Sequence, residues 1–185
     1  MEKPKEQNNN NNQIQILIIE DDLAHAGNYK KALEKNNYNL LFAKNAEEAL
    51  ALLKNTQNLA LIVTDVQLPD IDGFALSERI RKNKIFQDVP ILFISGIFTS
   101  EKDIFQGYEL GAFDYLIKPV NFSILKAKVK AYADIYSKVK NLEKAKQDLE
   151  NSNKELKISI DKIIQENKAL NDKFHENWDK LKNLL

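Results

Sequence analysis

Five short apolar runs separated by amphipathic segments constrain the fold of this 185-residue chain more than any other feature. The runs are rich in Ile, Leu, Val and Phe, and they occupy residues 14–19, 39–43, 59–64, 90–95 and 113–117. The segments between them have helical periodicity, and they occupy residues 23–36, 45–55, 73–83 and 100–110. Strands that alternate with helices need crossover connections, which pair the strands in parallel and place helices on both faces. The pattern therefore predicts an α/β fold built on one five-stranded parallel sheet.

The two ends of the chain differ in composition from this α/β region. Residues 1–13 contain an Asn run and no large apolar residue other than Met1, which predicts a disordered N-terminal lead. From Asn121 to the end, 65 residues contain neither Gly nor Pro. We therefore predict three parts: the lead, an α/β domain over residues 14–132, and an extension over 133–185 that continues the domain's last helix.

A heptad pattern runs through the C-terminal extension and the helix before it. With Leu142 at position d, the d residues are Ile135, Leu142, Leu149, Leu156, Ile163, Leu170, Asn177 and Leu184. The a residues are Tyr132, Val139, Lys146, Asn153, Ile160, Asn167, Phe174 and Leu181. Most of these side chains are apolar, which predicts a long C-terminal coiled-coil helix.

Several arrangements of this helix remain open from the sequence. Asn153 and Asn167 at a positions favour a dimer of fixed register. Ile164 and Trp178 at e positions widen the apolar stripe, so a four-helix bundle and either helix orientation stay possible. The helix can also pack as core against another domain.

Overall composition excludes some classes of protein and sets the expected compartment. Lys and Arg total 27 and Asp and Glu total 27, so the net charge gives no indication of nucleic acid or of a membrane surface. There is no Cys, which excludes disulfides and thiolate metal sites. No apolar run approaches the roughly 18 residues of a membrane span, and the N-terminus lacks the apolar core of a signal peptide. We expect a soluble, cytoplasmic protein that contacts neither membrane nor nucleic acid.

Charged and polar residues stand at the carboxyl ends of four predicted strands. In strand order they are Glu20, Asp21 and Asp22, then Asp65, then Ser95, and finally Lys118. Because ligands of open parallel sheets bind where the carboxyl ends of the strands meet, these side chains are expected to converge. Crowded carboxylates repel one another unless a cation lies among them, and oxygen ligands alone favour Mg²⁺. A carboxylate beside a metal and a lysine is suited to attack phosphorus and form an acyl phosphate.

Four linked motifs connect these residues to a known family. "IIEDD", "TDVQLPDIDGF", "ILFIS" and "GAFDYLIKPV" resemble the receiver domain of two-component response regulators over residues 14 to about 132. The resemblance implies a doubly wound, flavodoxin-like fold. It implies that Asp65 is the phosphoacceptor, that Glu20 and Asp21 are the acid pair, and that the backbone carbonyl of Gln67 binds the metal. It also implies that Ser95 carries the switch hydroxyl and that Tyr115 is the switch aromatic residue. By the same resemblance Lys118 is the family's invariant lysine, and Pro119 follows a cis peptide bond.

The resemblance also implies a function and a set of partners. We expect a response regulator that accepts a phosphoryl group on Asp65 from a histidine kinase or phosphotransfer protein, with Mg²⁺ bound by Glu20, Asp21, Asp65 and the Gln67 carbonyl. The switch would pass through the last helix to a dimeric coiled coil, and the output would lie outside these residues. We expect no enzyme activity beyond self-phosphorylation and self-dephosphorylation.

Two other functions remain as alternatives. One is an aspartyl-nucleophile phosphatase, although that class needs a second Asp where Gln67 stands. The other is a receiver-like scaffold that is not phosphorylated.

Residues beside these motifs are assigned structural roles. Asp22 is predicted to face solvent or cap the helix that follows, and Asp72 to cap the helix of residues 73–83. Asp70 and Asp72 are predicted to shape the turn with Gly73. His25 is predicted to be a surface residue.

Overall fold

Five parallel strands form a single sheet in the computed structural model, which describes residues 13–36, 38–96 and 114–182. The strands are β1 (Gln15–Ile19), β2 (Asn39–Ala43), β3 (Leu59–Asp65), β4 (Ile91–Ser95) and β5 (Asp114–Ile117). They are ordered β2-β1-β3-β4-β5, and every neighbouring pair is parallel. The predicted helix at 100–110, nearly all of the predicted lead and Leu184 lie outside the described residues.

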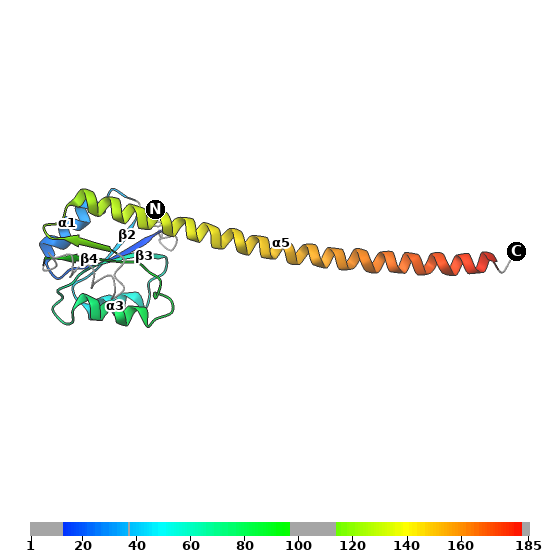
Figure 1. Cartoon of the computed structure of the whole chain (residues 1–185), viewed down its shortest axis with the longest axis horizontal. Coiled ribbons are helices and arrows are strands. Elements are labelled where there is room, and N and C mark those ends of the chain that lie inside the picture. The colour runs from blue at the N-terminus through cyan, green and yellow to red at the C-terminus, as the bar shows by residue number, and fades with distance from the viewer. Residues whose placement is uncertain (1–12, 37, 97–113, 183–185) are drawn as a thin grey trace, which may run out of the picture. The chain divides into compact units, whose positions relative to one another are not determined.

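Helices cover both faces of the sheet, as the α/β pattern predicts. They are α1 (Leu23–Leu33), α2 (Ala46–Leu53), α3 (Gly73–Arg81) and α5 (Phe122–Lys182). Figure 1 shows α1 and the start of α5 on one side of the strands and α3 on the other. The doubly wound α/β fold and the long C-terminal helix are therefore confirmed, with strand and helix ends within three residues of the predicted ones.

Alternation along the strands builds a separate core on each face. In β1, Ile16 and Ile18 pack with residues of α1 and α5, whereas Leu17 and Ile19 pack with residues of α2 and α3. Successive side chains of a strand point to opposite faces, so a strand buried on both sides needs a continuous apolar run. Helices on both faces of the sheet therefore fix the position of the carboxyl ends of the strands.

The first turns of α5 are anchored to the α/β domain. Leu125, Val129 and Ala133 are buried, and their spacing of four residues places them on one helical face. Lys128 forms an ion pair with Asp114 at the start of β5. The first turns of α5 therefore belong to the helical layer that covers the α1 face of the sheet.

Contacts divide the chain into two units, Met1–Tyr136 and Ser137–Leu185. In the second unit α5 continues, and every described residue from Lys138 to Lys182 is exposed. Its exposed side chains include those of Leu142, Leu149 and Leu170. Among the residues that the structure describes, no helix is both long and apolar enough to cross a membrane.

Candidate functional site

Three carboxylates meet where β1 and β3 end. Glu20 and Asp21 follow β1, and Asp65 is the last residue of β3. One carboxylate oxygen from each of the three residues lies within 4.8 Å of the others. Glu20 and Asp65 are only 4% and 7% exposed, whereas Asp21 is exposed. The predicted convergence of these acids is therefore found in the structure, with two of them buried.

Lys118 brings a positive charge to this cluster from the end of β5. Its Nζ lies 2.5 Å from Oδ2 of Asp65 and 3.4 Å from Oε2 of Glu20. Burial by itself lowers the pKa of Lys118, but the hydrogen bond and charge of Asp65, with the charge of Glu20, outweigh it and raise the pKa. The ammonium group therefore stays charged and offsets part of the repulsion among the acids.

Backbone geometry at the end of β5 sets where Lys118 stands. The backbone N–H of Lys118 donates to the carbonyl of Ser95 at 2.8 Å, which continues the pairing of β5 with β4. The bond between Lys118 and Pro119 is cis, as predicted.

Hydrogen bonds to the neighbouring backbone fix the Asp65 carboxylate. The backbone N–H of Gln67 donates to Oδ1 of Asp65 at 3.0 Å, while Lys118 binds Oδ2. The hydroxyl of Thr64 donates to the Asp65 carbonyl at 2.9 Å. Each carboxylate oxygen of Asp65 thus has its own donor, and the side chain is held in one orientation.

Gly73 allows helix α3 to begin directly beside Asp65. A Cβ at this position would lie 2.5 Å from the backbone oxygen of Asp65 and 3.1 Å from Cα of Val66. The Gly73 N–H donates to the carbonyl of Val66 at 2.8 Å. The glycine predicted as a turn residue is therefore needed for a close backbone approach that supports the site.

The donor set of the cluster suits a hard divalent cation. Glu20, Asp21 and Asp65 contribute carboxylate oxygens only, and the cluster includes neither a His nitrogen nor a Cys sulfur. Mg²⁺ prefers oxygen ligands and is held in proteins by one or two carboxylates together with water and phosphate oxygens. The burial of Glu20 and Asp65 also gives a reason for a cation, because Lys118 neutralises at most one of the three negative charges.

Comparison with known proteins identifies this arrangement. A family model described as the response regulator receiver domain matches residues 16–130. The chain belongs to this family.

Two curated relatives are similar to this chain over a stretch about as long as the receiver domain. The transcriptional regulatory protein YvrH of Bacillus subtilis is 37% identical over 118 residues, which are 63% of this chain and 48% of that protein. The transcriptional regulatory protein AfsQ1 of Streptomyces coelicolor is 36% identical over 116 residues, which are 63% and 49% of the two chains. The chain therefore spans about half the length of these relatives.

Solved structures show the same fold for the receiver domain. A two-component response regulator from Clostridium difficile is 35% identical, with a TM-score of 0.58 over 65% of this chain and 95% of the other. A putative response regulator from Chloroflexus aurantiacus is 30% identical, with a TM-score of 0.60 over 66% and 98%. Receiver domains of this family are phosphorylated on an aspartate and bind Mg²⁺ through acidic residues.

Ser95 and Tyr115 lie on the strands that complete the receiver domain's sheet. Ser95 ends β4 and is 1% exposed. Tyr115, in β5, stacks on Phe93 with ring centres 5.6 Å apart and an interplanar angle of 24°. The structure therefore places Ser95 at the end of β4, where its carbonyl accepts the N–H of Lys118, and Tyr115 three residues before Lys118 in the chain, while their switch roles stay predictions.

His25 of the receiver domain stands closer to the acids than the sequence suggested. Its Nδ1 lies 3.3 Å from Oε1 of Glu20, and its side chain is 48% exposed. It is an exposed surface residue, as predicted, but its imidazole also contacts Glu20 of the candidate site. The position of His25 in the first turn of α1, directly after the acids, is the sequence signal that could have indicated this contact. Asp22 caps the same turn by accepting hydrogen bonds from the N–H groups of Ala24 and His25.

Asp70 makes contacts in addition to the turn role predicted for it. Its carboxylate accepts hydrogen bonds from the backbone N–H groups of Ala46 and Glu47, at 3.1 and 3.0 Å. It therefore links the loop after β3 to the first turn of α2. Asp72 caps α3 through the N–H of Ala75 at 2.8 Å, as predicted.

Proposed function

We propose that Asp65 is the phosphoacceptor of this receiver domain and that a histidine kinase or phosphotransfer protein is the donor. One observation carries the proposal: Asp65 is buried, both of its carboxylate oxygens have donors, and Lys118 Nζ lies 2.5 Å from one of them. Asp21 is exposed, and Glu20 lies farther from the ammonium group, at 3.4 Å. Asp65 is therefore the acid best oriented to act as a nucleophile.

Phosphoryl transfer to Asp65 needs few protein groups. A carboxylate oxygen of Asp65 attacks the phosphorus of a phosphohistidine, the P–N bond breaks, and the imidazole of the donor leaves with the bonding electrons and takes a proton. The Lys118 ammonium offsets negative charge on the phosphoryl oxygens, so catalysis is mainly positioning and electrostatics. Glu20, Asp21, Asp65 and the backbone carbonyl of Gln67 would hold Mg²⁺, which supplies positive charge beside the transferring group.

The same geometry supports a route for the switch. A phosphoryl oxygen on Asp65 would attract the Ser95 hydroxyl, and Tyr115 would turn further inward into the space released. Because β5 is followed directly by α5, whose first turns are anchored to the sheet, a shift of β5 would reach that helix. Near-complete switching needs a difference of about 5.5 kcal/mol between the two states.

We further propose that the extension forms a homodimer through its coiled coil and that this coil receives the switch. The exposed apolar a and d residues of Ser137–Leu185 support the dimer, since such a stripe needs a partner in water. The proposed activity is limited to phosphorylation and dephosphorylation of Asp65. No phosphatase cycle is proposed, because Gln67 stands where an aspartyl-nucleophile phosphatase needs its second Asp.

Labelling with a small phosphodonor tests the acceptor. We expect the full chain to form a hydroxylamine-labile acyl phosphate in the presence of Mg²⁺, and we expect chelation of Mg²⁺ to prevent it. Asp65→Asn should abolish the label, whereas the matched variant Asp88→Asn, which changes an exposed loop acid, should keep it. Equal labelling of Asp65→Asn and the wild type would show that Asp65 is not the acceptor.

A second assay separates the receiver from a phosphatase. Steady turnover of p-nitrophenyl phosphate by the wild type, lost in Asp65→Asn, would contradict the proposed receiver function. A single stoichiometric phosphorylation event per chain supports it. Chemical-shift changes of the Gln67 and Lys118 amides on addition of Mg²⁺ would locate the metal independently of phosphorylation.

A further inference from the structure

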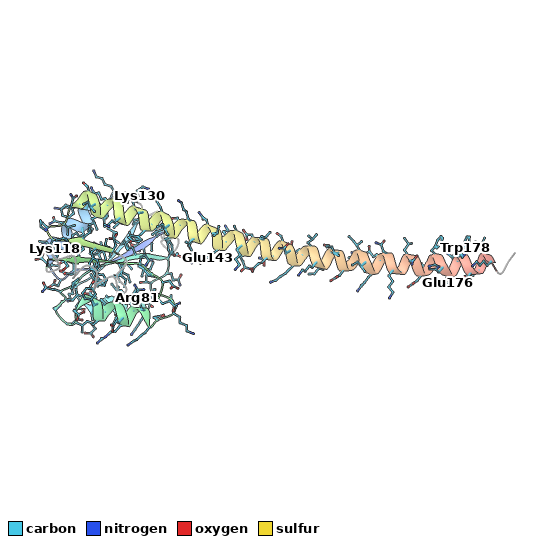
Figure 2. The ribbon with its side chains drawn as sticks, in the orientation of Figure 1. Arg81, Lys118, Lys130, Glu143, Glu176 and Trp178 are labelled. Atoms are coloured by element: carbon cyan, nitrogen blue, oxygen red, sulfur yellow. The ribbon has the colours of Figure 1, made fainter. Side chains whose placement is uncertain are left out.

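The extension presents an apolar stripe at its a and d positions that the described residues leave exposed and that polar residues interrupt at Lys146, Asn153, Asn167 and Asn177. Leu142 is 75% exposed, Leu149 is 62% exposed and Leu170 is 67% exposed, and all three occupy d positions. Figure 2 shows these turns of α5 with side chains projecting on all sides. The described part of the second unit, residues 137–182, is about 69 Å long at ~1.5 Å per residue. Apolar area of this extent on a helix is characteristic of an interface.

We infer that a second copy of this chain covers the stripe as a parallel coiled coil in exact register. The inference rests on the proposed dimer and adds its orientation and alignment. In a parallel pair without an offset, every a residue faces the same a residue of the second copy, and every d residue does likewise. Asn153 then meets Asn153, and Asn167 meets Asn167, so the carboxamide donors and acceptors satisfy each other across the seam.

Antiparallel pairing does not satisfy these two amides. In that orientation each a residue faces a d residue, and Asn177 is the only polar d residue in the described part of the extension, residues 137–182. A given alignment can place Asn177 opposite Asn153 or opposite Asn167, but not opposite both. At least one amide would then face Leu or Ile or lie beyond the overlap, and a buried amide without a hydrogen-bond partner is destabilising.

Parallel pairing with an offset fails for the same reason. A shift of one heptad places Asn153 opposite Lys146 or Ile160. A shift of two heptads pairs Asn153 with Asn167 once and leaves the other two amides without an amide partner. Only the unshifted alignment pairs all four amides of the dimer.

Flanking charges agree with the unshifted parallel alignment. In such a dimer each g residue faces the e residue five positions later in the second copy. The g residues are Lys138, Ala145, Ser152, Ser159, Glu166 and Lys173, and they face Glu143, Glu150, Lys157, Ile164, Asn171 and Trp178 in that order. The set contains one attractive pair, Lys138 with Glu143, one ammonium opposite an indole ring, and no pair of like charges.

Disulfide formation tests orientation directly, because the native chain has no cysteine. We expect Leu149→Cys and Leu170→Cys, each alone in the full chain, to oxidise to a covalent dimer. These positions are 21 residues apart, or about 32 Å along the helix, so an antiparallel alignment can link at most one of them to itself. The control Asn151→Cys, at position f on the outer face, should form no more than background amounts of dimer.

A mixture of Leu149→Cys with Phe174→Cys, one carrying a size tag, covers the opposite outcome, because this d residue faces this a residue in an antiparallel pair whose extensions overlap over their whole length. A mixed dimer that links Leu149→Cys to Phe174→Cys, without self-linked dimers of either variant, would overturn the parallel orientation. Light scattering on the unmodified chain keeps the two proposals apart. A monomer would overturn the dimer itself, a tetramer would overturn the two-stranded coil, and a dimer with only mixed links would overturn the orientation alone. Acyl phosphate formation on Asp65 is measured separately and depends on none of these outcomes.

Replacement of the amides provides a second measurement. Asn153→Val together with Asn167→Val should keep the helix but relax its alignment, so that mixed links and larger species appear beside the self-linked dimers. Circular dichroism verifies that the helix is kept. Unchanged self-linking, with no mixed product and no larger species, would show that the amides do not set the register.

Discussion

The receiver domain and the helical extension use the same apolar residue types in opposite ways. In the receiver domain, Leu33, Leu76 and Phe93 are fully buried by other parts of the same chain. In the extension, Leu142 and Leu170 are 75% and 67% exposed. One unit therefore completes its own core, whereas the other leaves its apolar side chains exposed, as the proposed dimer requires. The difference shows that apolar content alone does not indicate whether a segment buries its own apolar side chains, whereas the periodicity of the pattern does.

The largest expected effect comes from one substitution made in each unit. Leu76→Ala should lower the free energy of unfolding of the receiver domain by about 2–5 kcal/mol, because it leaves a cavity under α3. Leu170→Ala should leave that transition unchanged and weaken the dimer instead. Chemical denaturation at several protein concentrations measures both, since only loss of the coil depends on concentration.

The matched pair also shows how the comparison would fail. If Leu170→Ala lowered the stability of the receiver domain independently of concentration, the extension would share a core with that domain. If Leu76→Ala had no effect on the unfolding transition, the buried cluster beneath α3 would not be part of the cooperative unit.

Features that depend on neighbouring residues were predictable from the sequence. Apolar runs indicated the strands of the sheet. The rule that ligands gather at the carboxyl ends of parallel strands was enough to predict that Glu20, Asp65 and Lys118 lie together. The helix of the extension followed from its heptads and from the absence of Gly and Pro. Each of these inferences needs only local pattern and one topological rule.

Contacts that depend on tertiary approach were not predictable in the same way. Asp70 binds the N–H groups of α2, 24 and 23 residues earlier in the chain, and no spacing in the sequence announces that contact. Gly73 was predicted as an ordinary turn residue, whereas the structure shows that a larger residue is excluded there by the nearby backbone of Asp65. His25 was predicted to be a surface residue and is exposed, but its contact with Glu20 was not predicted.

The second prediction uses Gly73 and Gly27 to measure how tightly the receiver domain is packed around its site. Gly73→Ala should destabilise the domain by about 1–3 kcal/mol, because the new methyl group meets fixed backbone atoms of Asp65 and Val66. Gly27→Ala is the matched control, since no atom lies within 4 Å of its added Cβ and the residue is inside α1. That variant should be neutral or stabilising by up to about 1 kcal/mol. Thermal unfolding of the two variants measures the contrast, and equal losses would argue against a close approach specific to Gly73.

The third prediction concerns Asp70, which ties one loop of the receiver domain to α2. Desolvation alone raises the pKa of Asp70, but hydrogen bonds from the N–H groups of Ala46 and Glu47 outweigh it and lower the pKa below its usual value of 3.8. Because the folded pKa is the lower one, the stabilisation is present above pH 3.8 and is lost as the pH falls through the folded pKa. Asp70→Ala should therefore cost about 1 kcal/mol near neutral pH and progressively less in acid.

The conservative variant separates the charge of Asp70 from its hydrogen bonds. Asp70→Asn keeps an acceptor for the backbone N–H groups and should recover part of the loss, without the pH dependence of the wild type. Denaturation at neutral pH and near pH 3 distinguishes the cases. A difference between wild type and Asp70→Ala that stayed constant across this range would show that the carboxylate charge contributes nothing.

The smallest expected effect is in the extension, at an exposed ion pair. Lys180 Nζ lies 2.6 Å from Oε1 of Glu176 one turn earlier, and both side chains are about two-thirds exposed. Exposed pairs of this kind are typically worth about 0.3–0.5 kcal/mol, since water and salt screen them. Glu176→Gln should therefore barely change the helical melting curve, and 1 M salt should remove the difference. A loss comparable to that of Leu170→Ala would mean that ion pairs rather than the apolar seam hold the extension together. The two units would then differ in the kind of force that stabilises them, and not only in where their partner side chains come from.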